Sequence, residues 1–169
     1  MKMFHTVTIG LKPVVGGQEE GIVGRKNNKK KLVVFAIERK GKGISLMYGK
    51  VIEHSSAKEL GSFMKSTIEL TANIKTDQWT GYTPLAHDFE NLIQVPSGRK
   101  GNNFPDLHRA IMIFKGWLRG MHHNVEYLQS YINEYCYRFN RSNMKEGIFE
   151  NFMKRMVTNL PFSHKQIIA

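Results

Sequence analysis

Three side chains in the second half of the chain have types and spacings that suit a shared chemical site. Asp77 ends a short string, NIKTD, and a turn containing Trp79 and Gly81 follows at once. An acid at the carboxyl end of a strand is where open α/β sheets place their chemistry. His108 and Lys115 lie seven residues apart in a helical pattern, so they stack on one side of the helix and can reach one site together. The plainer alternatives are an aspartate that caps the next short helix and a solvated helix edge.

Two helices separated by a short break must position this histidine and lysine. The first is predicted to begin near Pro105, which suits a first helical turn. Its apolar residues recur every three or four positions and form one face that packs against the rest of the chain. The second is predicted over about residues 126 to 139 and ends beside Arg138 and Arg141. These two arginines can meet phosphate or complement the helix dipole.

The first half of the chain predicts a sheet with one helix. The apolar, β-branched run LVVFAIE suits a strand covered on both faces, and a short glycine turn joins it to a second strand in a hairpin. The first strand is expected to break at Gly10 and Pro13, because proline is poorly tolerated in a central strand. Ser56 with Glu59 forms a capping-box pattern that starts the helix after the hairpin. The predicted strands are 6–9 with 14–15, 32–38, 44–53, 72–76 and 91–95.

Residues 16 to 31 are rich in glycine and lysine and lack a hydrophobic period, which predicts an exposed loop. It can be a phosphate-cradling glycine loop, a localisation-like basic run or a hairpin loop that touches nucleic acid. The spacing lacks G-x-x-x-x-G-K-[ST], and a short basic run is unspecific, so we favour the third interpretation. Lys29, Lys30 and Lys31 are then candidate DNA contacts. Arg99 and Lys100, in a second loose loop, are either solvated or phosphate-facing.

Length and composition indicate one domain over residues 1–169. No apolar run approaches the roughly 20 residues of a membrane span, and the start has no export pattern, so we expect a cytoplasmic protein without a membrane partner. The one cysteine, Cys136, lies on an apolar helix face, which indicates a buried structural thiol.

The charge balance points to a polyanionic partner. The chain has 25 Lys and Arg against 14 Asp and Glu, a formal net charge of +11. Basic surfaces gain affinity for phosphate backbones by releasing counterions, so nucleic acid is the expected partner. Ribosome association and plain solubility are the alternatives. Trp79 can stack on bases or pack in the core.

The predicted order is strand, loop, strand, strand, helix, strand, short helix, strand, helix, helix and a basic tail. Antiparallel strands followed by strand-helix alternation indicate a mixed α/β sheet flanked by helices. This is also the element order of a ribonuclease-H-like core.

Several strings in the right order resemble the ISXO2-like group of insertion-sequence transposases of the DDE superfamily. The resemblance covers about Val14 to Val157, and its strings are VVGGQEEGIVGRKNNKKKLVVFAIER, TDQWTGY, GNNFPDLHRAIMIFKGWLR and YINEYCYRFNRS. It implies a ribonuclease-H-like fold, DNA as partner, possible homo-oligomers, and cleavage and strand transfer by Mg²⁺ or Mn²⁺ held between acidic residues.

The resemblance also assigns roles. Asp77 matches the second acid, His108 falls where members have the third ligand, and Lys115 matches the lysine that contacts the DNA terminus. Counting back from the GG string, the first acid falls at Leu11, with Lys12 in place of its acidic neighbour. Neither side chain has the anionic oxygen that a two-metal site requires.

Two function classes follow. The family's amino-terminal zinc ribbon has no counterpart here, since no C-x-x-C occurs, so we expect a truncated transposase with impaired catalysis. The alternative is a catalytically silent DNA-binding or interaction module derived from a transposase.

Overall fold

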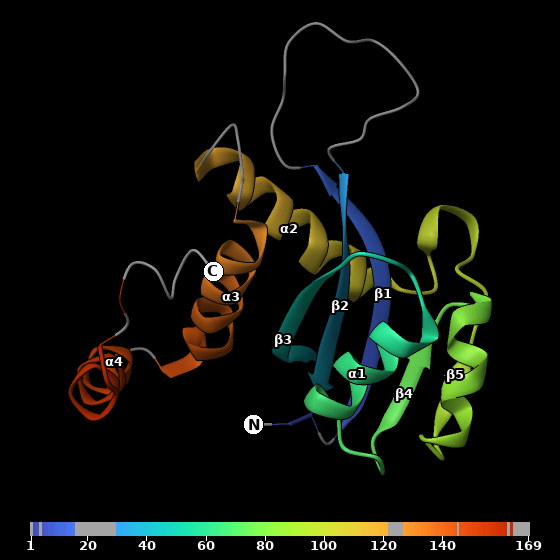
Figure 1. Ribbon diagram of the computed structural model, residues 1–169, viewed down its shortest axis with the longest axis horizontal. Helices are drawn as coiled ribbons and strands as arrows, with labels where there is room; N and C mark the ends of the chain where they lie inside the picture. The colour runs from blue at the N-terminus through green and yellow to red at the C-terminus, as the bar shows by residue number, and fades with distance from the viewer. Residues whose placement is uncertain are drawn as a thin grey trace, which may run out of the picture.

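One five-stranded sheet organises the chain (Figure 1). The computed structural model describes residues 2–3, 5–15, 30–121, 127–144, 146–161 and 163. The strand order is β3-β2-β1-β4-β5, in which β2 is antiparallel to both neighbours and β1, β4 and β5 run parallel. The strands are β1 (Thr6–Val15), β2 (Lys30–Lys40), β3 (Gly43–Ile52), β4 (Asn73–Thr76) and β5 (Leu92–Gln94). This is the predicted mixed sheet, and its order is compatible with a ribonuclease-H-like fold.

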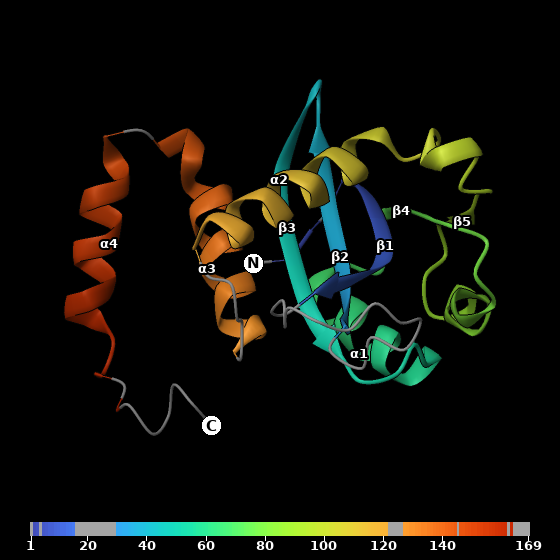
Figure 2. The same ribbon diagram turned by 90° about the horizontal axis from the view of Figure 1, so that it is seen from above.

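Helices cover both faces of the sheet, as Figures 1 and 2 show together. α1 lies on one face with the 3-10 helix η1, whereas α2 and α3 lie on the other face, α3 over β3. The helices are α1 (Ala57–Thr67), η1 (Thr80–His87), η2 (Arg99–Gly101), α2 (Pro105–Met121), α3 (Leu128–Arg141), η3 (Ser142–Met144) and α4 (Gly147–Thr158).

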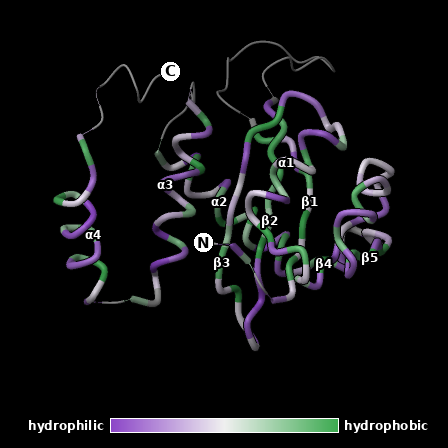
Figure 3. The backbone as a smooth tube through the Cα atoms, turned by 60° about the horizontal axis from the view of Figure 1, so that its bottom comes forward, coloured by the Kyte–Doolittle hydropathy of each residue, from purple (hydrophilic) through white to green (hydrophobic). Residues whose placement is uncertain are grey.

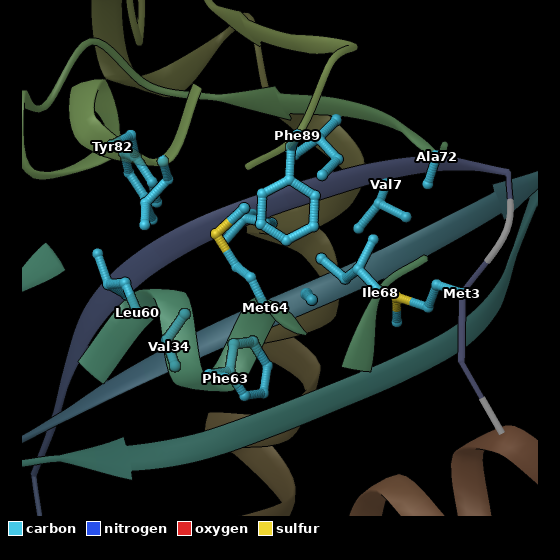
Figure 4. Packing of buried hydrophobic residues seen from close by; sticks show 14 of the residues in the cluster. Met3, Val7, Val34, Leu60, Phe63, Met64, Ile68, Ala72, Tyr82 and Phe89 are labelled. Carbon is cyan, nitrogen blue, oxygen red and sulfur yellow. The ribbon is translucent and has the colours of Figure 1, made fainter. Parts of the chain in front are cut away.

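Two apolar cores form because β2 is buried on both sides, as its continuous apolar run predicts. Val34 and Ala36 point to the first core, between the sheet and α1, while Phe35 and Ile37 point to the second core, under α2 and α3. Figure 4 shows the first core, where α1 sends its side chains onto the sheet. Its largest fully buried members are Tyr82, Phe89, Met3, Ile9, Leu60, Met64, Ile68 and Ile74.

β1 is continuous through Gly10 and Pro13, so the predicted break is wrong. β1 pairs with β4 only from Thr6 to Thr8, and at Pro13 its neighbour is β2 alone. The Pro13 carbonyl accepts a hydrogen bond from Lys115 Nζ at 3.0 Å and so points away from β2. In an antiparallel ladder the N–H and C=O of one residue point to the same side. The N–H that proline lacks would therefore face away from β2, and its absence costs no ladder bond.

Two boundaries differ from the sequence prediction. β2 begins at Lys30, so Lys30 and Lys31 belong to a strand and not to the loop. The expected basic tail contains α4, whose mixture of hydrophobic and hydrophilic residues is visible in Figure 3. The helix start at Ser56 is confirmed, since its side chain accepts from the backbone N–H of Glu59 at 3.3 Å.

Candidate active site and DNA-contacting surface

Asp77 stands at the carboxyl end of β4, as predicted. Its side chain is half-buried, and Oδ1 accepts the backbone N–H of Trp79 at 3.4 Å. The aspartate therefore braces the turn before η1 but does not cap that helix, whose N-cap is Trp79 and has no side-chain cap bond. A carboxylate has about four acceptor positions, so this one bond leaves most of its capacity for another partner.

The turn after Asp77 is held by aromatic packing. The Trp79 ring meets Tyr82 edge-on, with centroids 5.7 Å apart, and packs on the first core. It also lies directly over Gly81, where any Cβ would collide with the indole. Burial raises the pKa of the Tyr82 hydroxyl, and the nearby Asp77 charge raises it further. The ring of Trp79 is thus a packing element that fixes Asp77, which favours the core interpretation over base stacking.

His108 lies in the first part of α2 with its ring against Gly101. A side chain at Gly101 would collide with the imidazole, and Gly101 has a φ of 76°, so glycine is required there on both counts. Burial lowers the pKa of His108, and the charge of Lys12 lowers it further. Since the ordinary value is 6.5, the neutral imidazole is the form present at pH 7.

Alternation along β1 decides which of its residues faces His108. Leu11 packs against the first core, on the α1 side. Gly10 lies under Leu107 of α2, whose Cδ2 would be 2.7 Å from any added Cβ, and Lys12 acts electrostatically on His108. Even-numbered positions of β1 therefore face α2. The position predicted for the missing acid, Leu11, points to the opposite side of the sheet from His108.

Three lysines stand on the side of the sheet that α2 covers, and we call Lys12, Lys75 and Lys115 the lysine row. Lys75 Nζ donates to the Asn103 carbonyl at 2.9 Å and lies 4.9 Å from the Phe104 ring centroid, at the start of α2. Lys115 lies further along α2, where Nζ donates to Pro13 O. A continuous β1 would have placed Lys12 on the α2 side by strand alternation. The same alternation in the predicted strand 72–76 places Lys75 on the face opposite Ile74.

The remaining predicted DNA contacts do not share this surface. Arg138 is bound to Glu134 at 2.6 Å, and Arg141 stacks on Tyr137 with its guanidinium 3.8 Å from the ring centroid. Both lie on α3, which covers the β3 edge of the sheet, whereas Asp77 follows β4 near the other edge. Their intrachain partners fit a structural role.

The other predicted basic contacts are placed only in part. Arg99 is exposed in η2, next to Gly101, and Lys100 belongs to the same turn. Lys30 and Lys31 are in β2, and Lys29 lies outside the described residues.

The side chains around Asp77 and His108 do not fit a two-metal centre. Among the described residues no group of three or more His, Cys, Asp or Glu side chains could hold a metal ion. On the α2 side of β1 stand Gly10, which has no side chain, and Lys12, whose ammonium is a donor only and repels cations.

Comparison with known proteins gives one family. Residues 9–140 match the model described as the ISXO2-like transposase domain, which covers Asp77, His108 and Lys115. No curated protein matches the chain at a significant level. Among the described helices, none combines the length and the apolar character needed to cross a membrane.

Proposed function

This chain belongs to the ISXO2-like transposase family, and we propose that it is an insertion-sequence transposase domain with impaired catalysis. The observation that carries this proposal is the position of Lys12 on the α2 side of β1, where its positive charge lowers the pKa of His108 and where an acid would be needed. Over residues 1–169 we place one domain, because a single sheet supports both cores.

DNA binding rests on the lysine row. The family acts on DNA, and three ammonium groups on the α2 side of the sheet present positive charge of the kind that binds a phosphate backbone. Lys75 and Lys115 are each positioned by a hydrogen bond within the chain, so little of their side-chain entropy is lost on binding. Because these contacts are to phosphate, the domain binds with little sequence preference.

Metal-dependent cleavage and strand transfer are the impaired steps. The family generally uses divalent metal ions, which would be Mg²⁺ or Mn²⁺ and would activate the attacking and leaving oxygens. In this chain Asp77 offers one carboxylate, His108 a neutral imidazole, and Lys12 a positive charge. Two neutral or singly charged ligands beside a cation bind a divalent ion weakly.

Two measurements on the unmodified protein test the proposal. Fluorescence anisotropy with a labelled duplex should show tight binding. The affinity should fall steeply between 50 and 200 mM salt, by about tenfold for every few phosphate groups that the protein contacts. A nicking and strand-transfer assay with Mg²⁺ and with Mn²⁺ should show no turnover above a metal-free control. Metal-dependent cleavage by the unmodified chain would refute the impairment, and salt-insensitive or undetectable DNA binding would refute the role of the lysine row.

The second candidate is a catalytically silent interaction module. Its specific support is that Lys12 fills the position facing His108 with a group that suits phosphate better than metal. One experiment separates the two candidates: restoring a single acidic ligand on β1 and measuring DNA cleavage. A silent module gains no cleavage activity from this change, whereas an impaired transposase can gain some.

A further inference from the structure

α4 turns the side that carries Asn151 and Arg155 to its own chain, while most of its apolar side chains face away from it. Asn151 accepts from Arg141 Nε at 3.3 Å, and the Arg155 guanidinium lies 5.9 Å from the Tyr137 ring centroid. These two residues connect α4 to α3, and Ile148, which lies on the same side of the helix as Arg155, is half-buried. No described residue of α4 is buried, and Figures 1 and 2 both show the helix standing outside α3, away from the sheet.

The opposite side of α4 is an apolar stripe. At 100° per residue its members fall within about 140° of the helix circumference, roughly opposite Asn151 and Arg155. The exposed fractions are 66% for Phe149, 48% for Phe152, 42% for Met153, 59% for Met156 and 81% for Val157. A helix of 12 residues is marginal by itself in water, so such a stripe needs a partner surface.

We propose that the apolar stripe pairs with the same stripe of a second copy of this chain, with the two α4 helices antiparallel. The spacing Phe149, Phe152, Met156 is the three-then-four repeat of a two-helix seam. A two-fold axis near Phe152 would bring the stripe onto itself, so each copy covers the other.

The charges flanking the stripe select a second copy in this orientation. Glu150 and Lys154 lie on the same edge of the stripe, one turn apart, and both are exposed. In an antiparallel pair, equal edges meet, so Glu150 of each copy lies beside Lys154 of the other. A parallel pair would bring that edge against the edge carrying Arg155 and would leave this complementarity unused.

The first test compares two variants of the full chain with matched exposure. Met156→Glu places a carboxylate in the stripe, and Met112→Glu places one on α2, where the methionine is 60% exposed against 59% for Met156. Sedimentation velocity should show the unmodified chain and the Met112→Glu chain as dimers of the 19.5 kDa chain. Met156→Glu should raise the dissociation constant at least about tenfold, because the seam would then bury a charge. Circular dichroism of each variant confirms that the sheet and helices remain.

The second test uses rescue between chains. Glu150→Lys leaves two lysines on the edge, and Lys154→Glu leaves two glutamates, so each variant alone should dimerise more weakly than the unmodified chain. Mixing the two should restore dimers that contain one copy of each, which a light-scattering titration detects. An effect confined within one helix cannot be restored by mixing.

The proposal is overturned by any of three results. These are a monomer at every concentration up to about 100 μM, a dimer that Met156→Glu and Met112→Glu weaken equally, or a mixture of the charge variants that stays as weak as its components. A monomer would mean that another surface covers the stripe. None of these outcomes bears on DNA binding, because α4 carries no member of the lysine row.

Discussion

Replacing Lys12 by aspartate should increase affinity for Mn²⁺ and Mg²⁺, whereas the same change at Leu11 should not. The parallel pairing of β1 with β4 ends at Thr8 and Lys75, and beyond it Gly10 and Lys12 continue on the α2 side of β1. Lys12 lies two residues beyond Gly10 on the same side, about 7 Å along the strand. Leu11 points into the first core on the other side of the sheet.

The size of the effect follows from Coulomb's law. A unit charge about 7 Å from a divalent ion contributes about 1.2 kcal/mol in water. Lysine opposes the ion and aspartate attracts it, so Lys12→Asp changes the binding free energy by about 2.4 kcal/mol, or roughly sixtyfold in affinity. Direct ligation would add to this value. Leu11→Asp changes the charge by only one unit, away from His108, and buries a carboxylate in an apolar core, which costs stability.

Calorimetric titration of metal into each variant measures the gain. Asp77→Ala added to Lys12→Asp should abolish it, because the ion then loses its second carboxylate. The NMR titration of the His108 imidazole tests the same point without metal. Lys12→Asp removes one of the two causes that lower the pKa of His108, so that pKa should rise. Leu11→Asp should leave the pKa of His108 nearly unchanged. The reasoning is refuted if Leu11→Asp gains as much metal affinity as Lys12→Asp, or if the pKa of His108 does not respond to Lys12.

Three further outcomes can be checked on the same protein. In an anisotropy titration, Lys75→Ala and Lys115→Ala should each weaken DNA binding equally on all sequences. Each should also reduce by about one the slope of the logarithm of the binding constant against the logarithm of salt concentration. Lys58→Ala, on the α1 face, should change neither the affinity nor this slope. Burial raises the pKa of Cys136 to about 12, so at pH 8 only about one thiol in ten thousand is a thiolate. Ellman's reagent should therefore label the native chain slowly and the denatured chain quickly. Rapid labelling of the native chain would contradict the packing around Cys136. Phe114→Ala should lower the free energy of unfolding by about 3–5 kcal/mol in a single urea transition, since its fully buried ring packs against Phe35, Trp117 and Tyr135. A loss under about 1 kcal/mol, or two separate transitions, would argue against one cooperative domain.

The family and the element order were readable in the sequence because both depend on local patterns. The run LVVFAIE suited a strand buried on both faces, and the apolar spacing of α2 defined the face that packs on the sheet. The acid at the end of β4 and the histidine and lysine of α2 were likewise visible, since strand ends and helical spacing position them without knowledge of the fold. Net charge indicated the class of partner, because it depends on composition alone and needs no knowledge of the fold.

The tertiary structure decided which side of the sheet each residue faces. A shift of one residue moves every side chain of a strand to the other face, and local sequence does not determine that register. The continuous β1 brings Lys12 to His108 and sends Leu11 to the first core. Pro13 is accepted because β4 ends before it, and the outward stripe of α4 depends on which side of that helix meets α3. These features are set by neighbours distant in the chain, so they follow from packing and not from the local pattern.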